Sequence, residues 1–311
     1  TDLTAIAAAT SGTITASGVT TITGSATEII AAHDNPELTS LDSDFTVTIS
    51  GTASAANANT IMGYTSGIVT ATVTATGAVA DLNTALSNAA SNDALTLVLN
   101  ATSVAAADLN TLDGKTSVAI NANSIATMTG TAADVKTALD SSGITEDGGI
   151  EVTVTGTAAA TDLTAIAAAT SGTITASGVT TITGTAAEIM AAHDDSSELS
   201  SIDTDFEATV TGTAAATDLT ALAAATSGTI TASGVTTITG TATAINAAHN
   251  NGELTSIDGD FAATVTGTAT EDELTALNGY TTGAINASGV TAITAGTAAD
   301  VVALIDDGTV T

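Results

Sequence analysis

Apolar and polar positions follow two different periods along this chain. In residues 162–166, Asp-Leu-Thr-Ala-Ile, the two large apolar side chains lie three positions apart, which places them on one face of a helix. Residues 173–175 and 181–184 instead alternate Thr with Ile, and β-branched residues at period two are typical of strands. A Ser-Gly pair at 171–172 separates the two patterns. The sequence therefore predicts a short Ala-rich helix followed by two short strands.

This helix–strand pattern recurs along the whole chain. Residues 1–24 are identical to residues 161–184, and residues 217–240 differ from them only at Leu222. A shorter junction, in which a Thr-rich strand leads into a helical start, returns every 25 to 29 residues. These junctions lie at Gly24, Gly51, Gly77, Thr102, Gly130, Gly156, Gly184, Gly212, Gly240, Gly267 and Gly296. Because one such unit cannot bury its apolar face alone, the repeat predicts stacked coils.

The expected fold is an α/β solenoid of about eleven coils of roughly 27 residues, with short parallel strands and short Ala-rich helices. We expect residues 1–311 to form a single continuous repeat array. Its repeats are degenerate over 77–130 and near-identical over 1–51, 156–212 and 212–267.

Several helix starts carry a capping box, in which a Ser or Thr hydroxyl and a Glu carboxylate three residues later each satisfy an orphan backbone amide. Ser25 with Glu28 and Thr185 with Glu188 fit this pattern. These pairs predict where each helix begins.

The two ends of the sequence lack the polar capping unit that an isolated solenoid usually needs. The strand that precedes Asp162 has no counterpart before Asp2. The sequence is therefore either a slice of a longer chain, or its ends pair with further copies of the chain. Head-to-tail pairing of this kind is heterologous and can run into a homopolymeric filament.

Composition excludes several classes of function. The chain has 66 Ala, 68 Thr, no Cys, 33 acidic residues and two Lys, for a net charge of −31. Lys115 and Lys136 cannot form a phosphate-binding groove, which argues against nucleic acid and anionic membranes as partners. Without Cys there is no disulfide or thiol chemistry. No stretch of 18 apolar residues is present, so we expect no membrane span.

Two stretches carry a resemblance to known repeats. Residues 107–118, Ala-Asp-Leu-Asn-Thr-Leu-Asp-Gly-Lys-Thr-Ser-Val, are followed by Thr-Met-Thr-Gly-Thr-Ala-Ala-Asp-Val-Lys-Thr-Ala at 127–138, and a related phrase spans 281–294. These phrases resemble repeats in very large secreted or cell-surface proteins of marine cyanobacteria. The resemblance implies an extracellular structural, adhesive or motility-related role. It carries over no catalytic residue.

Three acidic turns are candidate calcium sites, because Ca²⁺ prefers several oxygen ligands. Their acidic residues are Asp34, Glu37, Asp42 and Asp44 in the first turn, Asp194, Asp195, Glu198, Asp203 and Asp205 in the second, and Glu253, Asp258 and Asp260 in the third. None matches the twelve-residue calcium loop. The alternative is a set of helix-ending turns with solvated acids, and the fold requires no cofactor in either case.

Histidines precede the acidic turns, at His33, His193 and His249. Active sites are rarely copied from repeat to repeat, so we expect these residues to stack or to end helices, and the protein not to be an enzyme. The expected function is an extracellular structural protein that forms or belongs to a filament or surface layer. The alternatives are a rigid spacer or adhesive stalk of a giant surface protein or phage fibre, and an ice-binding solenoid with arrayed Thr side chains.

Overall fold

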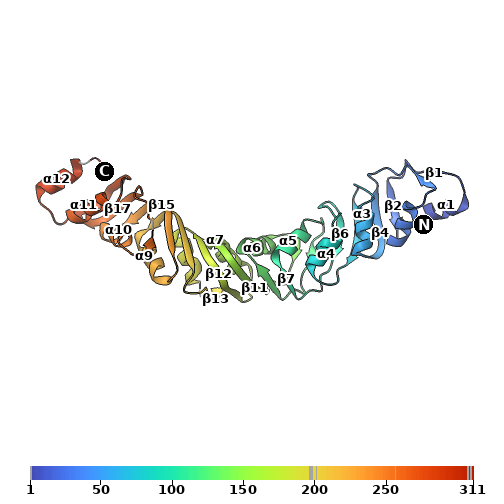
Figure 1. Ribbon diagram of the computed structural model, residues 1–311, viewed down its shortest axis with the longest axis horizontal. Helices are drawn as coiled ribbons and strands as arrows, with labels where there is room; N and C mark the ends of the chain where they lie inside the picture. Colours follow the sequence, from blue (N-terminus) through green and yellow to red (C-terminus); the bar gives the residue numbers. More distant parts are fainter. Residues whose placement is uncertain (1, 196–198, 201, 256, 307, 309) are drawn as a thin grey trace. The chain divides into compact units, whose positions relative to one another are not determined.

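The computed structural model describes residues 2–195, 199–200, 202–255, 257–306, 308 and 310–311 (Figure 1). The chain divides into two compact units. Unit 1 comprises residues 1–130, 134–152 and 169–172, and unit 2 comprises residues 131–133, 153–168 and 173–311. No helix in the described part of the chain is long and apolar enough to cross a membrane.

Short helices recur along the chain, as the apolar spacing predicts. They are α1 Asp2–Ala9, α2 Ala26–His33, α3 Ala55–Met62, α4 Val79–Ala85, α5 Ala106–Asp113, α6 Ala132–Asp140, α7 Ala160–Ala169, α8 Ala186–Asp194, α9 Ala216–Ala225, α10 Ala242–His249, α11 Glu271–Tyr280 and α12 Ala298–Asp306.

Strands fill the intervals between these helices. They are β1 Ile14–Thr15, β2 Thr21–Gly24, β3 Leu38–Thr39, β4 Thr46–Ser54, β5 Val69–Thr74, β6 Ala94–Leu97, β7 Ser103–Ala105, β8 Ile120–Asn121, β9 Thr127–Gly130, β10 Ile144–Thr145, β11 Glu151–Ala159, β12 Ile174–Gly184, β13 Leu199–Ser200, β14 Glu207–Ala215, β15 Ile230–Gly240, β16 Leu254–Thr255, β17 Ala262–Ala269 and β18 Ile285–Ile293.

Capping boxes begin several of these helices. Both elements of the box are formed by Ser25 with Glu28 at α2 and by Thr185 with Glu188 at α8, which confirms the two pairs expected from the sequence. Thr270 and Glu273 form a third box at α11. Each box ties a strand end to the start of the next helix by satisfying amides that the helix leaves unpaired.

Parallel pairing joins strands that lie one repeat apart, so the fold is α/β with parallel sheets. In unit 2, β14 pairs with β15, β15 with β17 and β17 with β18, all in parallel. In unit 1, β2, β4, β5 and β6 form a parallel sheet in that order. Successive helices pack beside one another and against these strands.

One repeated sequence adopts two strand arrangements. The expectation of two short strands is wrong for residues 173–184, from which it was drawn, and for the equivalent residues 229–240, because β12 and β15 are each one strand of 11 residues. It is right for residues 1–24, where β1 and β2 are separate. β14 pairs with the middle of β15 at Gly234 and Val235. The described partners of β1 and β2 are β3 and β4, and residues 16–20 between β1 and β2 belong to no strand. A neighbouring strand therefore decides whether the two short strands join.

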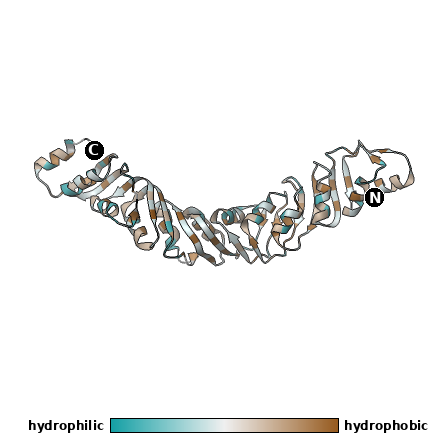
Figure 2. Cartoon of the chain, viewed as in Figure 1, coloured by the Kyte–Doolittle hydropathy of each residue, from teal (hydrophilic) through white to brown (hydrophobic). Residues whose placement is uncertain are grey.

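Small apolar side chains fill the core between helices and sheets. Ile174, Ile182 and Val210, which alternate with Thr along their strands, are 0% exposed. Figure 2 shows hydrophobic residues recurring along strands and helices from one repeat to the next. The largest fully buried side chains are Phe45, Phe206 and Phe261, which occupy equivalent repeat positions. Burial of these alternate positions sets the register of each strand.

Candidate functional site

The acidic turns begin at the C-terminal ends of α2, α8 and α10. Asp34 and Asp195 are the C-cap residues of α2 and α8, and Asn250 takes this position at α10. The backbone amides of Glu37 and Glu253 then donate to the side-chain oxygens of Asn35 and Asn251. In the first and third turns, the first half is thus a helix end stabilised by local hydrogen bonds.

The second half of each acidic turn has the sequence Asp-x-Asp-Phe. Its carboxylates are exposed at Asp42, Asp44, Asp203, Asp205, Asp258 and Asp260. The following Phe is buried in all three turns. These turns therefore place two carboxylates in solvent and anchor the backbone through an aromatic side chain.

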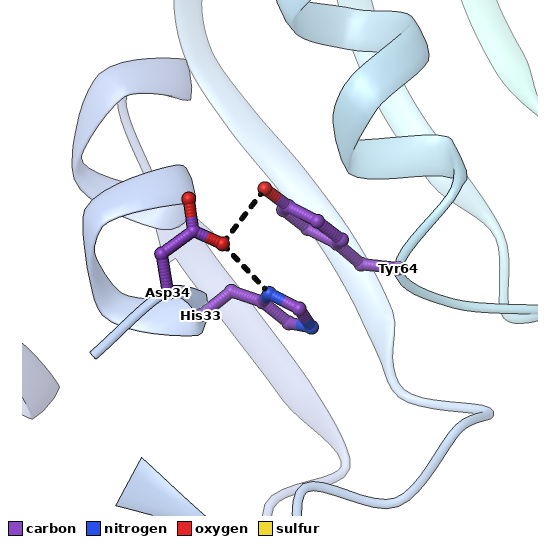
Figure 3. A network of polar contacts seen from close by, with 3 residues as sticks. All are labelled: His33, Asp34 and Tyr64. Atoms are coloured by element: carbon purple, nitrogen blue, oxygen red, sulfur yellow. Dashed lines mark hydrogen bonds and ion pairs between the residues drawn. The ribbon is translucent and has the colours of Figure 1, made fainter. Parts of the chain in front are cut away.

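The candidate calcium ligands that the structure describes are not gathered into a cluster. Among the described residues, no group of three or more acidic or His side chains is arranged to hold a metal ion. Glu198 lies outside the described residues. In the first turn, the Asp34 carboxylate is engaged by protein donors (Figure 3). Calcium binding by these turns stays a prediction.

A His–Asp–Tyr network lies where the first acidic turn begins (Figure 3). The rings of His33 and Tyr64 stack with centroids 3.5 Å apart and an interplanar angle of 9°. The Tyr64 hydroxyl donates to Asp34 Oδ1 at 3.1 Å, and His33 Nδ1 lies 3.2 Å from the same oxygen. The network joins the C-terminal end of α2 to that of α3, in the next repeat.

Burial is the main reason that the pKa of Tyr64 is raised above its ordinary value of 10.0. The hydrogen bond to Asp34 and the charge of that carboxylate add to the rise, because both favour the protonated phenol. Tyr64 therefore remains a hydrogen-bond donor across the neutral range. This arrangement holds two helix ends together.

A related stack occurs 216 residues further along the chain. His249 and Tyr280 stack with centroids 4.0 Å apart and an interplanar angle of 10°. Asn250 replaces the Asp of the first network, and its Nδ2 donates to the Tyr280 hydroxyl at 3.0 Å. His249 Nδ1 is buried and has no hydrogen-bond partner among the described residues. Both copies thus have the His–Tyr stack, but only the first copy has a carboxylate beside it.

The remaining histidine, His193, has no tyrosine beside it. His193 Nδ1 lies 3.0 Å from Asp194 Oδ1, and its ring is tilted by 37° against Phe206 at 5.9 Å. Ala225 stands directly before Thr226, the position that Tyr280 takes before Thr281. The stacking role expected for the histidines is therefore seen for His33 and His249. The two tyrosines of the sequence decide which copies stack.

A second recurring feature was not expected from the sequence. At the end of a helix, a buried or half-buried Thr donates its hydroxyl to a backbone carbonyl 20 residues earlier, and the same hydroxyl accepts from the amide of the Gly two residues later. We call this motif the Thr latch. Its donors and acceptors are Thr65 to Phe45, Thr170 to Ile150, Thr226 to Phe206 and Thr281 to Phe261.

The glycine of each Thr latch lies against the same backbone. A Cβ atom at Gly228 would collide with the carbonyl group of Phe206, and Gly283 stands in the same way against Phe261. The constant interval of 20 residues between a large apolar residue, Phe in three copies and Ile150 in the fourth, and the Thr is the sequence signal that could have revealed the latch. The Thr latch thus hydrogen-bonds the residue just before one strand to the end of the helix that follows that strand.

Comparisons with protein-family models, with curated proteins and with solved structures found no match for this chain. The fold class, α/β with parallel strands, thus rests on the structure itself.

Proposed function

We propose that the chain is an α/β solenoid and serves as an extracellular structural repeat protein, in a filament or surface layer built by end-to-end stacking. The observation that carries this proposal is the layered register of unit 2. Thr209 of β14 pairs with Thr231 of β15, and Thr239 of β15 pairs with Thr264 of β17. Each layer offers the next the same kind of backbone edge, and such edges template further pairing.

The charge distribution favours association of molecules along the strand-pairing direction over lateral aggregation. The net charge of −31 makes whole molecules repel one another. The strand β15, in contrast, contains no charged residue. In seawater-level salt the repulsion is screened within less than about 8 Å, so neutral edges can meet.

Negative-stain electron microscopy of the purified chain in seawater-level salt tests this proposal. Regular fibres are the expected result, and dispersed particles at every protein concentration would overturn the filament. The same grids with millimolar calcium test the acidic turns. The matched variant carries Asp258→Asn and Asp260→Asn, and any calcium-dependent change that it retains would argue against the third turn as a calcium site.

A rigid spacer or adhesive stalk is the second candidate function. The Thr latches favour it, because each closes its strand and helix within one chain and needs no second molecule. Analytical ultracentrifugation in the same salt separates the two candidates. A concentration-independent monomer supports the spacer, and mass that grows with concentration supports the filament.

Ice binding has weaker support than either candidate. Aligned threonines do occur, for example Thr213 opposite Thr237. However, Thr181 pairs with Glu207 and Thr237 pairs with Ala262, which interrupts the array. A thermal-hysteresis measurement tests this alternative directly.

A further inference from the structure

The sequence contains two Asn-Gly pairs, and the structure places them in different surroundings. Asn251 and Gly252 lie in the third acidic turn, just after α10, whereas Asn278 and Gly279 lie within α11. In such a pair the backbone nitrogen of the glycine can attack the side-chain carbonyl carbon of the asparagine, because glycine carries no side chain that hinders the approach. Which pair reacts therefore depends on how each glycine nitrogen is held.

Local hydrogen bonds fold the Asn251 side chain over the backbone that follows it. Its Oδ1 accepts from the amide of Glu253 at 3.0 Å, which closes a turn around Gly252. The backbone carbonyl of Asn251 accepts from the amide of Leu254 at 3.1 Å. The Gly252 amide has no hydrogen-bond partner among the described residues. The turn thus holds the Asn251 carboxamide beside a backbone nitrogen that no other group engages.

The fold itself does not require a glycine at position 252. Gly252 is exposed, and a Cβ atom added there would meet no other atom within 4 Å. Its φ is not among the positive values that other glycines of the chain adopt. Gly228, in contrast, is required by the close approach of the Phe206 carbonyl. What Gly252 provides is an unhindered backbone nitrogen.

The first acidic turn supplies a natural control, because it has the same hydrogen bonds. The Oδ1 of Asn35 accepts from the amide of Glu37 at 2.9 Å, and its carbonyl accepts from Leu38 at 3.1 Å. The next residue is Pro36, whose ring nitrogen carries no hydrogen and cannot attack by this route. The second turn has Asp195 in the place of the asparagine. The three turns therefore present a blocked asparagine, an aspartate and a reactive asparagine.

The helix α11 protects the other Asn-Gly pair. Gly279 lies inside the helix, where a backbone N–H is bonded to the carbonyl four residues earlier. Attack by the Gly279 nitrogen on Asn278 has to wait until the last turn of the helix opens. The reaction is thus expected in the third acidic turn and suppressed in α11.

We propose that Asn251 is a site of spontaneous deamidation, through which the third acidic turn gains a carboxylate. The Gly252 nitrogen forms a bond to Cγ of Asn251, the Cγ–Nδ2 bond breaks, and the proton of the Gly252 amide leaves with the nitrogen as ammonia. The product is a cyclic imide. Water then adds to one of its two carbonyl carbons and opens the ring to aspartate or isoaspartate, so the step needs no oxidant or reductant.

The two products have different consequences for the turn. Aspartate keeps an oxygen that accepts from the amide of Glu253 and gives the third turn the residue that the second has at Asp195. Isoaspartate adds a methylene group to the backbone and turns the Asn251 carbonyl, the acceptor for Leu254, into part of a free carboxylate. Leu254 begins β16 and pairs with Ile230. The isoaspartate form should therefore loosen β16 from β15. This inference goes beyond the proposed function and holds with or without a filament.

Peptide mass spectrometry of the full chain, incubated in mildly alkaline buffer made with water enriched in heavy oxygen, tests the proposal. We expect the peptide with Asn251 to lose its amide nitrogen and to gain labelled oxygen at least about tenfold faster than the peptides with Asn278 and Asn35. Electron-transfer fragmentation separates isoaspartate from aspartate. In concentrated urea, which unfolds α11, the rate at Asn278 should rise to that at Asn251, while Asn35 stays unreactive.

Two variants at position 252 serve as matched controls. Gly252→Ala should keep the melting temperature, because the added methyl group enters open space, and should slow the reaction at least about tenfold by hindering the nitrogen. Gly252→Pro copies the first turn and should stop it. Equal rates at Asn251 and Asn278 in the folded chain would overturn the proposal. Absence of labelled product at Asn251, or an unchanged rate in Gly252→Ala, would do the same.

Discussion

The hydroxyl of Thr226 donates a hydrogen bond of 2.5 Å to the carbonyl oxygen of Phe206, which lies 20 residues earlier in the chain. Thr226 is 5% exposed, so both groups are removed from water. The same hydroxyl accepts from Gly228 at 2.9 Å. One side chain thus satisfies two backbone groups, the carbonyl of Phe206 just before β14 and the amide of Gly228 just beyond the end of α9.

Thr226→Val removes this donor while keeping the shape of the side chain. We expect the local opening free energy of the β14–β15 ladder to fall by about 1–3 kcal/mol, because the Phe206 carbonyl is left buried and unpaired. Hydrogen exchange at the amides of β14 measures this. Thr10→Val is the matched control, and a change above about 0.5 kcal/mol there would contradict the assignment, because Thr10 is exposed.

Gly228→Ala tests the close approach that the Thr latch requires. The added methyl group would collide with the Phe206 carbonyl, so the ladder must shift, at a cost of about 1–3 kcal/mol or more. The control is Gly12→Ala, whose methyl group would make only a 3.4 Å contact with the Thr10 hydroxyl. Equal melting temperatures for the two variants would argue that the latch geometry is not required for folding.

The stack between His249 and Tyr280 predicts that removing a ring lowers stability and that adding a ring at the equivalent position raises it. Tyr280→Ala should destabilise the α10–α11 contact by about 1 kcal/mol, since aromatic pairs contribute on this order beyond their buried area. Ala225→Tyr places a ring at the equivalent position and should stabilise the α8–α9 contact by a similar amount.

Ring-current shifts of the His193 imidazole protons in NMR spectra check the engineered stack. An upfield shift is expected in Ala225→Tyr and not in Ala225→Leu, which adds bulk without a ring. Unchanged His193 resonances in the Tyr variant would contradict the equivalence of the two positions.

The capping box at α11 predicts a pH dependence. The Thr243 hydroxyl first, and then the backbone amide of Thr270, lower the pKa of Glu273 below its ordinary value of 4.5. A lowered pKa in the folded state means that the stabilisation is fully present above pH 4.5 and is lost as the pH falls through the folded value.

Glu273→Gln separates this effect from the titration of the other acids. A Gln side chain can still accept at the N3 position of a capping box, and it does not titrate. Between about pH 6 and about pH 3, the melting temperature of the wild-type chain should therefore fall more than that of the variant. Parallel curves would show that the Glu273 carboxylate contributes no pH-dependent stability.

Much of the fold could be read from local patterns. The Leu and Ile spacing in residues 162–166 and the Ser25–Glu28 box were sufficient to place helices, because propensity and capping act within a few residues. Ile174, Ile182 and Val210 alternate with Thr and are buried, as a period of two predicts for one face of a strand. The acidic turns begin at helix ends, but the sequence could not place their carboxylates relative to one another, because turn conformation decides where such side chains point.

The sequence by itself determined the repeat, the helix starts, the buried positions and the parallel α/β class, because these follow from periodicities of two and near four. Tertiary structure alone decided whether residues such as 14–24 and 230–240 form two strands or one. The same residues have different hydrogen-bond partners in the two places, and strand length depends on the backbone next to them. Likewise, the Thr10 and Thr226 hydroxyls are chemically equivalent, and only a neighbouring carbonyl makes one of them a latch.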